Sequence, residues 1–325
     1  TNHLKCASFE LPFDSDEYTE DIAAGKILDF LASENIVRRS GDRYHWSSEI
    51  YPAQQISLRS ASPDNFVILN ETKNHEVIGE VDYFSAPIFL HPEAIYLHGA
   101  DQYQVTKLDW DGKKAYVKEV DVDYFTDAET KTDLKVLSVI DETSTLDGAK
   151  VHHGEVTLTC TTVMFKKVKF QTHENVGSGE LKLPELEMHT TAFWYSFPGD
   201  VSYKIGMERS DLGGSLRGLA NILGRMAPLW VMCDTRDLRS ISQVRAPFTE
   251  QPTVYIYENI PGGVGLSQKI FAESDKLFEA CREHVAHCKC AAGCPSCVGP
   301  PMEVGNNGKA GVLDLLEYML AVEVV

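Results

Sequence analysis

The sequence lacks several features that would place it in a well-defined class. No run of about 18 apolar residues occurs, so no membrane-spanning helix is expected. The N-terminus has no basic stretch followed by an apolar core and a small-residue cleavage site, so no secretory signal is expected. The chain begins at Thr1 rather than at a methionine, which indicates a piece of a longer polypeptide.

A nucleotide-hydrolysing motor is also missing. No Gly-x-x-x-x-Gly-Lys-Ser/Thr string occurs, and such a loop cradles the phosphates in a large class of ATPases. The acidic string Asp141-Glu142-Thr143-Ser144 lacks the histidine of an Asp-Glu-x-His box. We therefore expect that this chain alone neither binds nor hydrolyses ATP.

Basic residues are scarce. The 325 residues include 30 Lys and Arg against 48 Asp and Glu, a formal net charge of −18. Such a surface repels a phosphate backbone at long range, so any contact with nucleic acid must be local. The hydrophobic content of 43% is sufficient for a sizeable core, and the length suggests two or three compact units.

The pattern predicts an α+β fold that begins with a winged-helix-like unit over residues 1–58. A helix with an apolar stripe that includes Ile27, Phe30 and Leu31 is expected to end near Ser33 to Asn35. Two short strands around a Ser-Gly-Asp turn follow between Ile36 and Trp46. A helix followed by a hairpin is the outline of a winged helix.

Two further units are predicted. Residues 59–195 are rich in β-branched and aromatic residues and in turn signals, which favours a β-rich, barrel-like middle region. One of these signals is an Asp-Gly hairpin turn at Asp109 to Lys113. Residues 196–325 are expected to form an α/β C-terminal domain with a four-cysteine zinc loop. Its helices are predicted at Ser215 to Trp230, Leu266 to Val285 and Val312 to Val322.

Four of the eight cysteines, Cys288, Cys290, Cys294 and Cys297, lie within ten residues. Four thiolates in one short loop suit a tetrahedral zinc ion, and a full set of protein ligands indicates a structural role rather than a catalytic one. A redox dithiol at Cys294 and Cys297 or an iron–sulfur cluster are the alternatives. His284 and His287 lie nearby as reserve ligands.

A glycine-rich turn at Pro261 to Gly265 lies between a predicted strand and a predicted helix. Such a position suits either a plain tight turn or a contact to a phosphate backbone. Carboxylates could in principle gather into a nuclease metal site, although no spacing motif links the candidates, Asp200, Glu208, Asp237 and Glu258.

Two basic groups stand out against the acidic background as candidate DNA contacts. Arg38, Arg39 and Arg43 share the predicted hairpin with Trp46, a combination that suits phosphate pairing together with base stacking. Arg217, Asn221 and Arg225 follow one another at four-residue steps, so the two arginines share one edge of the predicted helix that begins at Ser215. The alternative for both groups is an ordinary solvent-exposed charged surface without a ligand.

The string Cys288-x-Cys290-x-x-Gly293-Cys294-Pro295-x-Cys297, preceded by Pro261 to Gly265, resembles the C-terminal zinc-binding domain of the mitomycin repair factor A helicases. These are superfamily 2 enzymes related to the yeast Hrq helicase. The segments Thr1 to Ala7 and Trp46 to Ser62, which includes Ser57-Leu58-Arg59-Ser60-Ala61-Ser62, also resemble that family. The resemblance spans nearly the whole chain.

The resemblance implies a noncatalytic region of an ATP-dependent 3′-to-5′ DNA helicase in repair. It implies a structural zinc at the four cysteines, with ATP and magnesium bound only by motor domains in cis. The implied DNA is single-stranded or tailed, and the implied location is the cytoplasm, at the nucleoid. The alternatives are a zinc-stabilised scaffold for protein contacts without DNA binding, and a metal-dependent nuclease.

Overall fold

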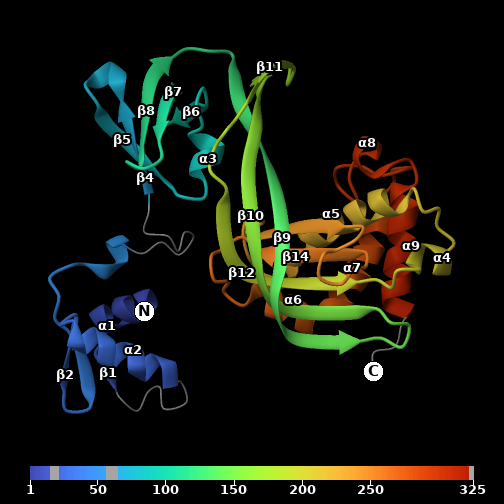
Figure 1. Cartoon of the computed structure of the whole chain (residues 1–325), viewed down its shortest axis with the longest axis horizontal. Coiled ribbons are helices and arrows are strands. Elements are labelled where there is room, and N and C mark those ends of the chain that lie inside the picture. Colours follow the sequence, from blue (N-terminus) through green and yellow to red (C-terminus); the bar gives the residue numbers. More distant parts are fainter. Residues whose placement is uncertain (15–21, 56–64, 322–325) are drawn as a thin grey trace.

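The computed structural model describes residues 1–14, 22–55 and 65–321. It combines an N-terminal lobe, a five-stranded sheet and a larger sheet with helices packed on one face (Figure 1). Among the described residues, no helix combines the length and hydropathy needed to cross a membrane. The expected α+β class, with a small N-terminal unit and a curled sheet, is confirmed.

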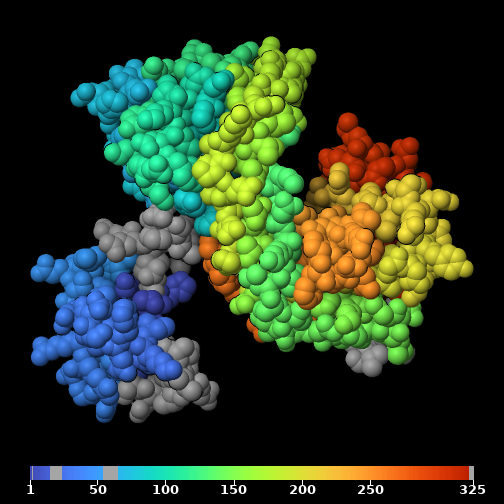
Figure 2. Space-filling view, in the orientation of Figure 1, coloured from blue at the N-terminus to red at the C-terminus, as the bar shows by residue number. Residues whose placement is uncertain are grey.

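The N-terminal lobe has its own hydrophobic core and forms a separate lobe in the space-filling view (Figure 2). Its elements are α1 (Asn2–Glu10), β1 (Phe13–Asp14), α2 (Ile22–Ser33), β2 (Val37–Ser40), β3 (Arg43–Trp46) and the 3-10 helix η1 (Pro52–Gln55). The predicted hairpin is present as β2 and β3. The expected boundary at residue 58 and the segment Ser57 to Ser62 lie outside the described residues.

One residue of the predicted apolar stripe on α2 was placed wrongly. Phe30 is 55% exposed, whereas Leu28 and Leu31 are buried. The buried stripe follows Ala24, Leu28 and Leu31, at the four- and three-residue steps of one helix face, and Phe30 lies beside that face.

The five-stranded sheet has the strand order β5-β4-β8-β7-β6, with β4 and β8 parallel and the other pairs antiparallel. Its elements are β4 (Asn65–Asn70), η2 (Glu71–Lys73), β5 (Glu76–Asp82), α3 (Ala86–Phe89), β6 (Ile95–His98), β7 (Asp101–Asp109) and β8 (Lys114–Val120). The predicted Asp-Gly turn joins β7 to β8, where the Asp109 carboxylate accepts a hydrogen bond from the Gly112 N–H at 3.0 Å.

A long hairpin leads from this sheet into the larger one (Figure 1). The larger sheet contains β9 (Tyr124–Ser144), β10 (Lys150–Lys169), β11 (Asn175–Glu180), β12 (Leu186–Ser196), β13 (Leu238–Gln243) and β14 (Thr253–Glu258). Its order is β11-β10-β12-β14-β13, and β9 pairs with β10. The predicted boundary between residues 195 and 196 therefore falls inside a continuous sheet, because β12 hydrogen-bonds to β14.

Helices cover one face of the larger sheet and enclose the main core between Phe193 and Tyr195 on β12 and Leu216 and Leu219 on α5. They are α4 (Val201–Lys204), α5 (Leu212–Val231), α6 (Leu266–Ala272), α7 (Ser274–His287), α8 (Pro301–Val304) and α9 (Gly308–Ala321). A second core, which includes Trp194 and Tyr255, lies on the opposite face of the sheet.

The single helix expected from Leu266 to Val285 is in fact two helices that meet at Glu273. The break changes the direction of the chain, so that α6 packs against strands β10, β12 and β14 while α7 packs against α5 and α9. The final helix begins at Gly308, four residues before the predicted start at Val312.

The β-bulge in the pairing of β9 with β10 predicts a position at which an added side chain would destabilise the fold. A Cβ atom on Gly154 would lie 2.1 Å from the Ser138 carbonyl oxygen, and both are backbone sites in paired strands. We expect Gly154→Ala to destabilise the fold by about 1–3 kcal/mol through overpacking, measured as a lower midpoint of thermal unfolding. The matched control is Gly199→Ala, because no atom lies within 4 Å of the added methyl group. An unchanged midpoint for Gly154→Ala would contradict the close approach.

Candidate metal centre and nucleic-acid interface

The four predicted cysteines converge on one point. The Sγ–Sγ distances are 3.5 Å for Cys288–Cys290 and Cys290–Cys297, and 3.6 Å for Cys288–Cys294 and Cys294–Cys297. A tetrahedral zinc with bonds of about 2.3 Å places its sulfurs about 3.8 Å apart, so the quartet fits that ion closely. In the described part of the chain, these four side chains are the only group of three or more potential ligands that converges in this way.

The chain reaches this geometry through a short loop after α7. The Cys294 carbonyl oxygen accepts hydrogen bonds from the backbone N–H groups of Cys297 and Gly299, each at 3.0 Å, which closes a knuckle around the second ligand pair. Gly293 has φ of +134°, a backbone conformation that residues with a side chain rarely adopt. The glycine before Cys294 therefore permits the turn.

The thiols lie close enough to share their protons. Burial, followed by hydrogen bonds from the neighbouring thiols, raises the pKa of Cys290 to about 12. The backbone hydrogen bond at Ser296 lowers the pKa of Cys294 to about 7, and the Cys297 thiol acts in the same direction. The quartet therefore favours a thiolate at Cys294, and a divalent cation would be needed to hold four thiolates together.

Helix α5 holds one side of the loop through side chains on its polar edge. Asn221 Nδ2 donates to the Val298 carbonyl oxygen at 2.9 Å, and Arg225 Nη1 donates to the Cys297 carbonyl oxygen at 3.3 Å. Arg217 Nη1 lies 3.5 Å from the carbonyl oxygen of Glu303. The edge that was predicted to contact DNA thus faces the cysteine loop, and a DNA role for Arg217 and Arg225 stays a prediction.

Helix α9 holds the other side through a residue that sequence reasoning missed. Lys309 Nζ donates to the carbonyl oxygens of Cys288 and Cys290, at 2.5 and 2.9 Å. Its ammonium group places a positive charge beside a centre that would carry two negative charges as zinc tetrathiolate. No local signal marks Lys309, because the contact spans 19 residues of sequence or more.

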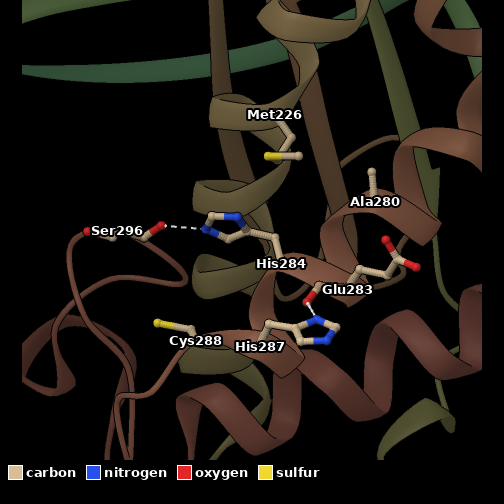
Figure 3. Close-up of a pocket in the computed structure, with 7 residues that line it drawn as sticks. All are labelled: Met226, Ala280, Glu283, His284, His287, Cys288 and Ser296. Atoms are coloured by element: carbon tan, nitrogen blue, oxygen red, sulfur yellow. Dashed lines mark hydrogen bonds between the residues drawn. The ribbon is translucent and has the colours of Figure 1, made fainter.

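The two nearby histidines point one ring nitrogen each at a backbone carbonyl (Figure 3). His284 Nε2 lies 2.9 Å from the Ser296 oxygen, and His287 Nδ1 lies 2.8 Å from the Glu283 oxygen. They line an open depression of about 510 Å³ beside Cys288. Neither histidine belongs to the converging group of four cysteines.

The predicted DNA-binding hairpin is largely engaged within the N-terminal lobe. Arg39 Nη1 lies 3.9 Å from Asp29 Oδ1, and Arg43 Nε lies 3.4 Å from Asp14 Oδ2. These ion pairs are exposed, so each contributes little to stability and exchanges easily for a phosphate. Arg38 is exposed and forms no ion pair or side-chain hydrogen bond within the described ranges.

The hairpin tryptophan packs into the lobe. Trp46 is half-buried, its ring centre lies 6.0 Å from that of Phe9, and it contacts the core formed by Leu31 and Val37. Phe9 and Tyr51, whose ring centres are 5.1 Å apart, are the more exposed aromatic residues on this side. Base stacking by Trp46 stays a prediction.

The glycine-rich turn binds the side-chain carboxylate of Glu258 rather than an external ligand. Glu258 is fully buried, and its carboxylate accepts hydrogen bonds from the N–H groups of Val264 at 2.6 Å and Ser267 at 2.8 Å. The hydroxyls of Ser267 and Thr191 donate to the same carboxylate at 2.7 and 2.8 Å. Two N–H groups of the turn and the start of α6 are therefore occupied by a side chain of the protein, which favours the plain-turn interpretation.

Comparison with known families supports both ends of this description. Residues 219–298, which include all four cysteines, match the MrfA Zn-binding domain. Residues 1–61 match the winged helix domain of the ATP-dependent helicase HRQ1.

Similar proteins extend the match to almost the whole chain. The uncharacterized ATP-dependent helicase YprA of Bacillus subtilis is 45% identical over 98% of this chain and 42% of its own length. The helicase HRQ1 of Saccharomyces cerevisiae is 23% identical over 91% of this chain and 28% of its own length. The chain thus spans less than half the length of these curated relatives.

A solved structure shares the architecture. The crystal structure of the DUF1998 helicase MrfA bound to DNA superimposes with a TM-score of 0.64 at 44% identity, over 98% of this chain and 42% of that one. The match includes the lobe, the sheets and the cysteine loop. Over nearly its whole length the chain therefore matches the region of MrfA-type helicases that carries the winged-helix and zinc-binding domains.

Proposed function

We propose that this chain is the noncatalytic accessory region of an ATP-dependent 3′-to-5′ DNA helicase that acts in repair. In this proposal it positions a DNA strand for motor domains that lie outside these 325 residues. The observation that carries it is a cysteine quartet with zinc geometry in a chain that is 45% identical, over 98% of its length, to a helicase.

We propose that the metal is zinc and that its role is structural. The four thiolates complete a tetrahedral coordination shell, so no position is left open for a substrate or a water. ATP and magnesium would be bound by the motor domains. The ion would fix the loop between α7 and α8 against α5 and α9, and the polar edges of those helices already point at the loop.

The scaffold alternative has one observation in its favour. Four of the five arginines predicted to contact DNA already have a partner inside the protein, as described above. With a net charge of −18, the surface suits a basic protein partner more readily than a nucleic acid. A nuclease has no comparable support, because the Glu258 carboxylate is already hydrogen-bonded within the fold.

The metal assignment predicts about one zinc per chain. Replacing Cys294 and Cys297 with Ser should abolish metal retention and unfold the surrounding loop, because closed thiolate sites contribute folding energy directly. Elemental analysis of the purified protein measures the metal. The control is Cys6→Ser with Cys233→Ser, since both lie outside the quartet. Iron in place of zinc, or full zinc retention by the double variant, would contradict the assignment.

The contact from α9 predicts a change in zinc retention. Lys309→Met should leave the cysteines intact but weaken zinc affinity by about tenfold, the lower end of the usual effect of groups that support metal ligands. Competition with a chromogenic chelator measures this, and Lys309→Arg should restore part of the loss. Lys276→Met is the control, because Lys276 lies on α7 and pairs with Glu273. Equal affinity in all three variants would show that Lys309 only packs.

The DNA role predicts local, salt-sensitive binding to single strands. Arg38→Ala with Arg39→Ala and Arg43→Ala should weaken binding and flatten the dependence of affinity on salt, by about 0.7 in the logarithmic slope for each lost phosphate contact. Because Arg38 has no ion pair within the part of the chain that the structure describes, Arg38→Ala alone should give a measurable share of the loss. Fluorescence anisotropy with a labelled oligonucleotide tests this against Arg282→Ala, which removes a charge paired with Glu279. A triple variant with the parent's affinity and slope would favour the scaffold.

A further inference from the structure

A second candidate site lies on the face of the larger sheet opposite the helices, and none of the four clustered cysteines lines it. It is a cavity of about 640 Å³ between this face and α3 of the five-stranded unit. Met188 and Tyr257 form part of its wall and belong to the core on that face. The volume is within the range of about 300–1,000 Å³ typical of small-ligand sites, so it admits a nucleotide-sized group and excludes a duplex.

The hairpin strands supply hydroxyl groups with unused hydrogen-bonding capacity. Thr130 pairs with Thr162 and Thr132 pairs with Cys160 across β9 and β10, so these side chains share one face of the sheet. Their mutual contacts are long, 3.5 Å between the two threonine hydroxyls and 3.7 Å from Thr132 to the thiol. Such weak contacts leave the hydroxyls able to bind the polar edge of a ligand.

The charged residues at this cavity are engaged, with one exception. The Asp82 carboxylate accepts from the N–H groups of Phe84 and Ser85, each at 3.1 Å, and Arg236 forms a two-pronged pair with Asp234 at 3.0 and 3.1 Å. Asp237 accepts from the Asp234 N–H at 3.2 Å. Arg239 is exposed, lies opposite Tyr257 on β14, and forms no side-chain hydrogen bond or ion pair among residues 65–321. Among the described residues that line this cavity, Arg239 is thus the one cation without an ion pair, and it offers a single contact to a phosphate beside the carboxylates of Asp82 and Asp237.

Apolar side chains complete the wall. Phe84 and Ile88, which is 40% exposed, face the cavity from the five-stranded unit. A ligand that combines one anionic group, a flat apolar surface and polar edges matches this lining, and a nucleotide within a single strand has that chemistry.

We propose that this cavity holds a nucleotide of single-stranded DNA, with a phosphate at Arg239 and a base against Phe84 and the threonine hydroxyls. The inference rests on the proposed function, because it adds a second strand contact to the hairpin. An acidic chain would then bind a strand through separated local contacts, at the hairpin and at this cavity, rather than through one basic surface.

Two variants test the site through different readouts. Arg239→Ala should lower the logarithmic salt slope by about 0.7, so it should weaken binding of an oligothymidine most at low salt and progressively less as the salt concentration rises. Thr132→Val should weaken binding without changing the slope, because it removes no charge. Arg245→Ala is the control, since Arg245 is exposed, lies shortly after β13 and pairs with Glu250. Unchanged thermal midpoints establish that all three variants fold.

Photo-crosslinking locates the strand directly. An oligonucleotide containing 5-iodouracil should give adducts on peptides that contain Phe84, Met188 or Tyr257, and Arg239→Ala should reduce them. Parent-like binding by Arg239→Ala with no adducts at these peptides would overturn the inference while leaving the hairpin proposal intact. Failure of the parent protein to bind any oligonucleotide would overturn both. Displacement of the oligonucleotide by an equal concentration of mononucleotide would show a free-nucleotide site instead and overturn the strand assignment.

Discussion

The mutual repulsion of four thiolates is the constraint on which the C-terminal half depends. Sulfurs 3.5–3.6 Å apart can all be ionised only around a cation, so in the zinc-bound state that we propose the metal would define the shape of the loop between α7 and α8. Helices α5 and α9 pack against this loop, and the side chains of Arg225 and Lys309 donate hydrogen bonds to its carbonyl oxygens. The positive side chains also offset the net negative charge of the centre. Metal, loop and helices thus stabilise one another.

The rest of the molecule connects this rigid part to a separate lobe. The β9–β10 hairpin spans from the C-terminal helices to the five-stranded sheet, and the N-terminal lobe keeps its own core. Parts with separate cores suit the accessory role that we propose, because each part is held together by its own contacts. Within the larger sheet, the buried Glu258 holds the glycine-rich turn in place through its hydrogen bonds, without an external anion.

Sequence reasoning succeeded where the signal was local. The cysteine spacing, the hairpin turn before Arg43 and the Asp109 turn all depend on residues within a few positions of one another. It failed where tertiary contacts decide. The break at Glu273 follows from the different packing partners of α6 and α7, and the exposure of Phe30 follows from which face of α2 meets the sheet.

The same distinction applies to the candidate site. Arg217 and Arg225 were correctly grouped on one helix edge, but what that edge faces depends on a loop about 70 residues away in sequence or more. Lys309 was invisible for the same reason. The sequence can thus single out a basic residue in an acidic chain as a candidate for a polar contact. Only the fold shows whether that residue contacts the cysteine loop or is available to a phosphate backbone.

X-ray absorption at the zinc edge of the purified protein tests the central claim most directly. The account predicts a first shell of four sulfur atoms at about 2.3 Å and no oxygen or nitrogen neighbour. A shell that contains light atoms, or fewer than four sulfurs, would mean that His284, His287 or water takes part, and would contradict a closed structural centre at the cysteine quartet.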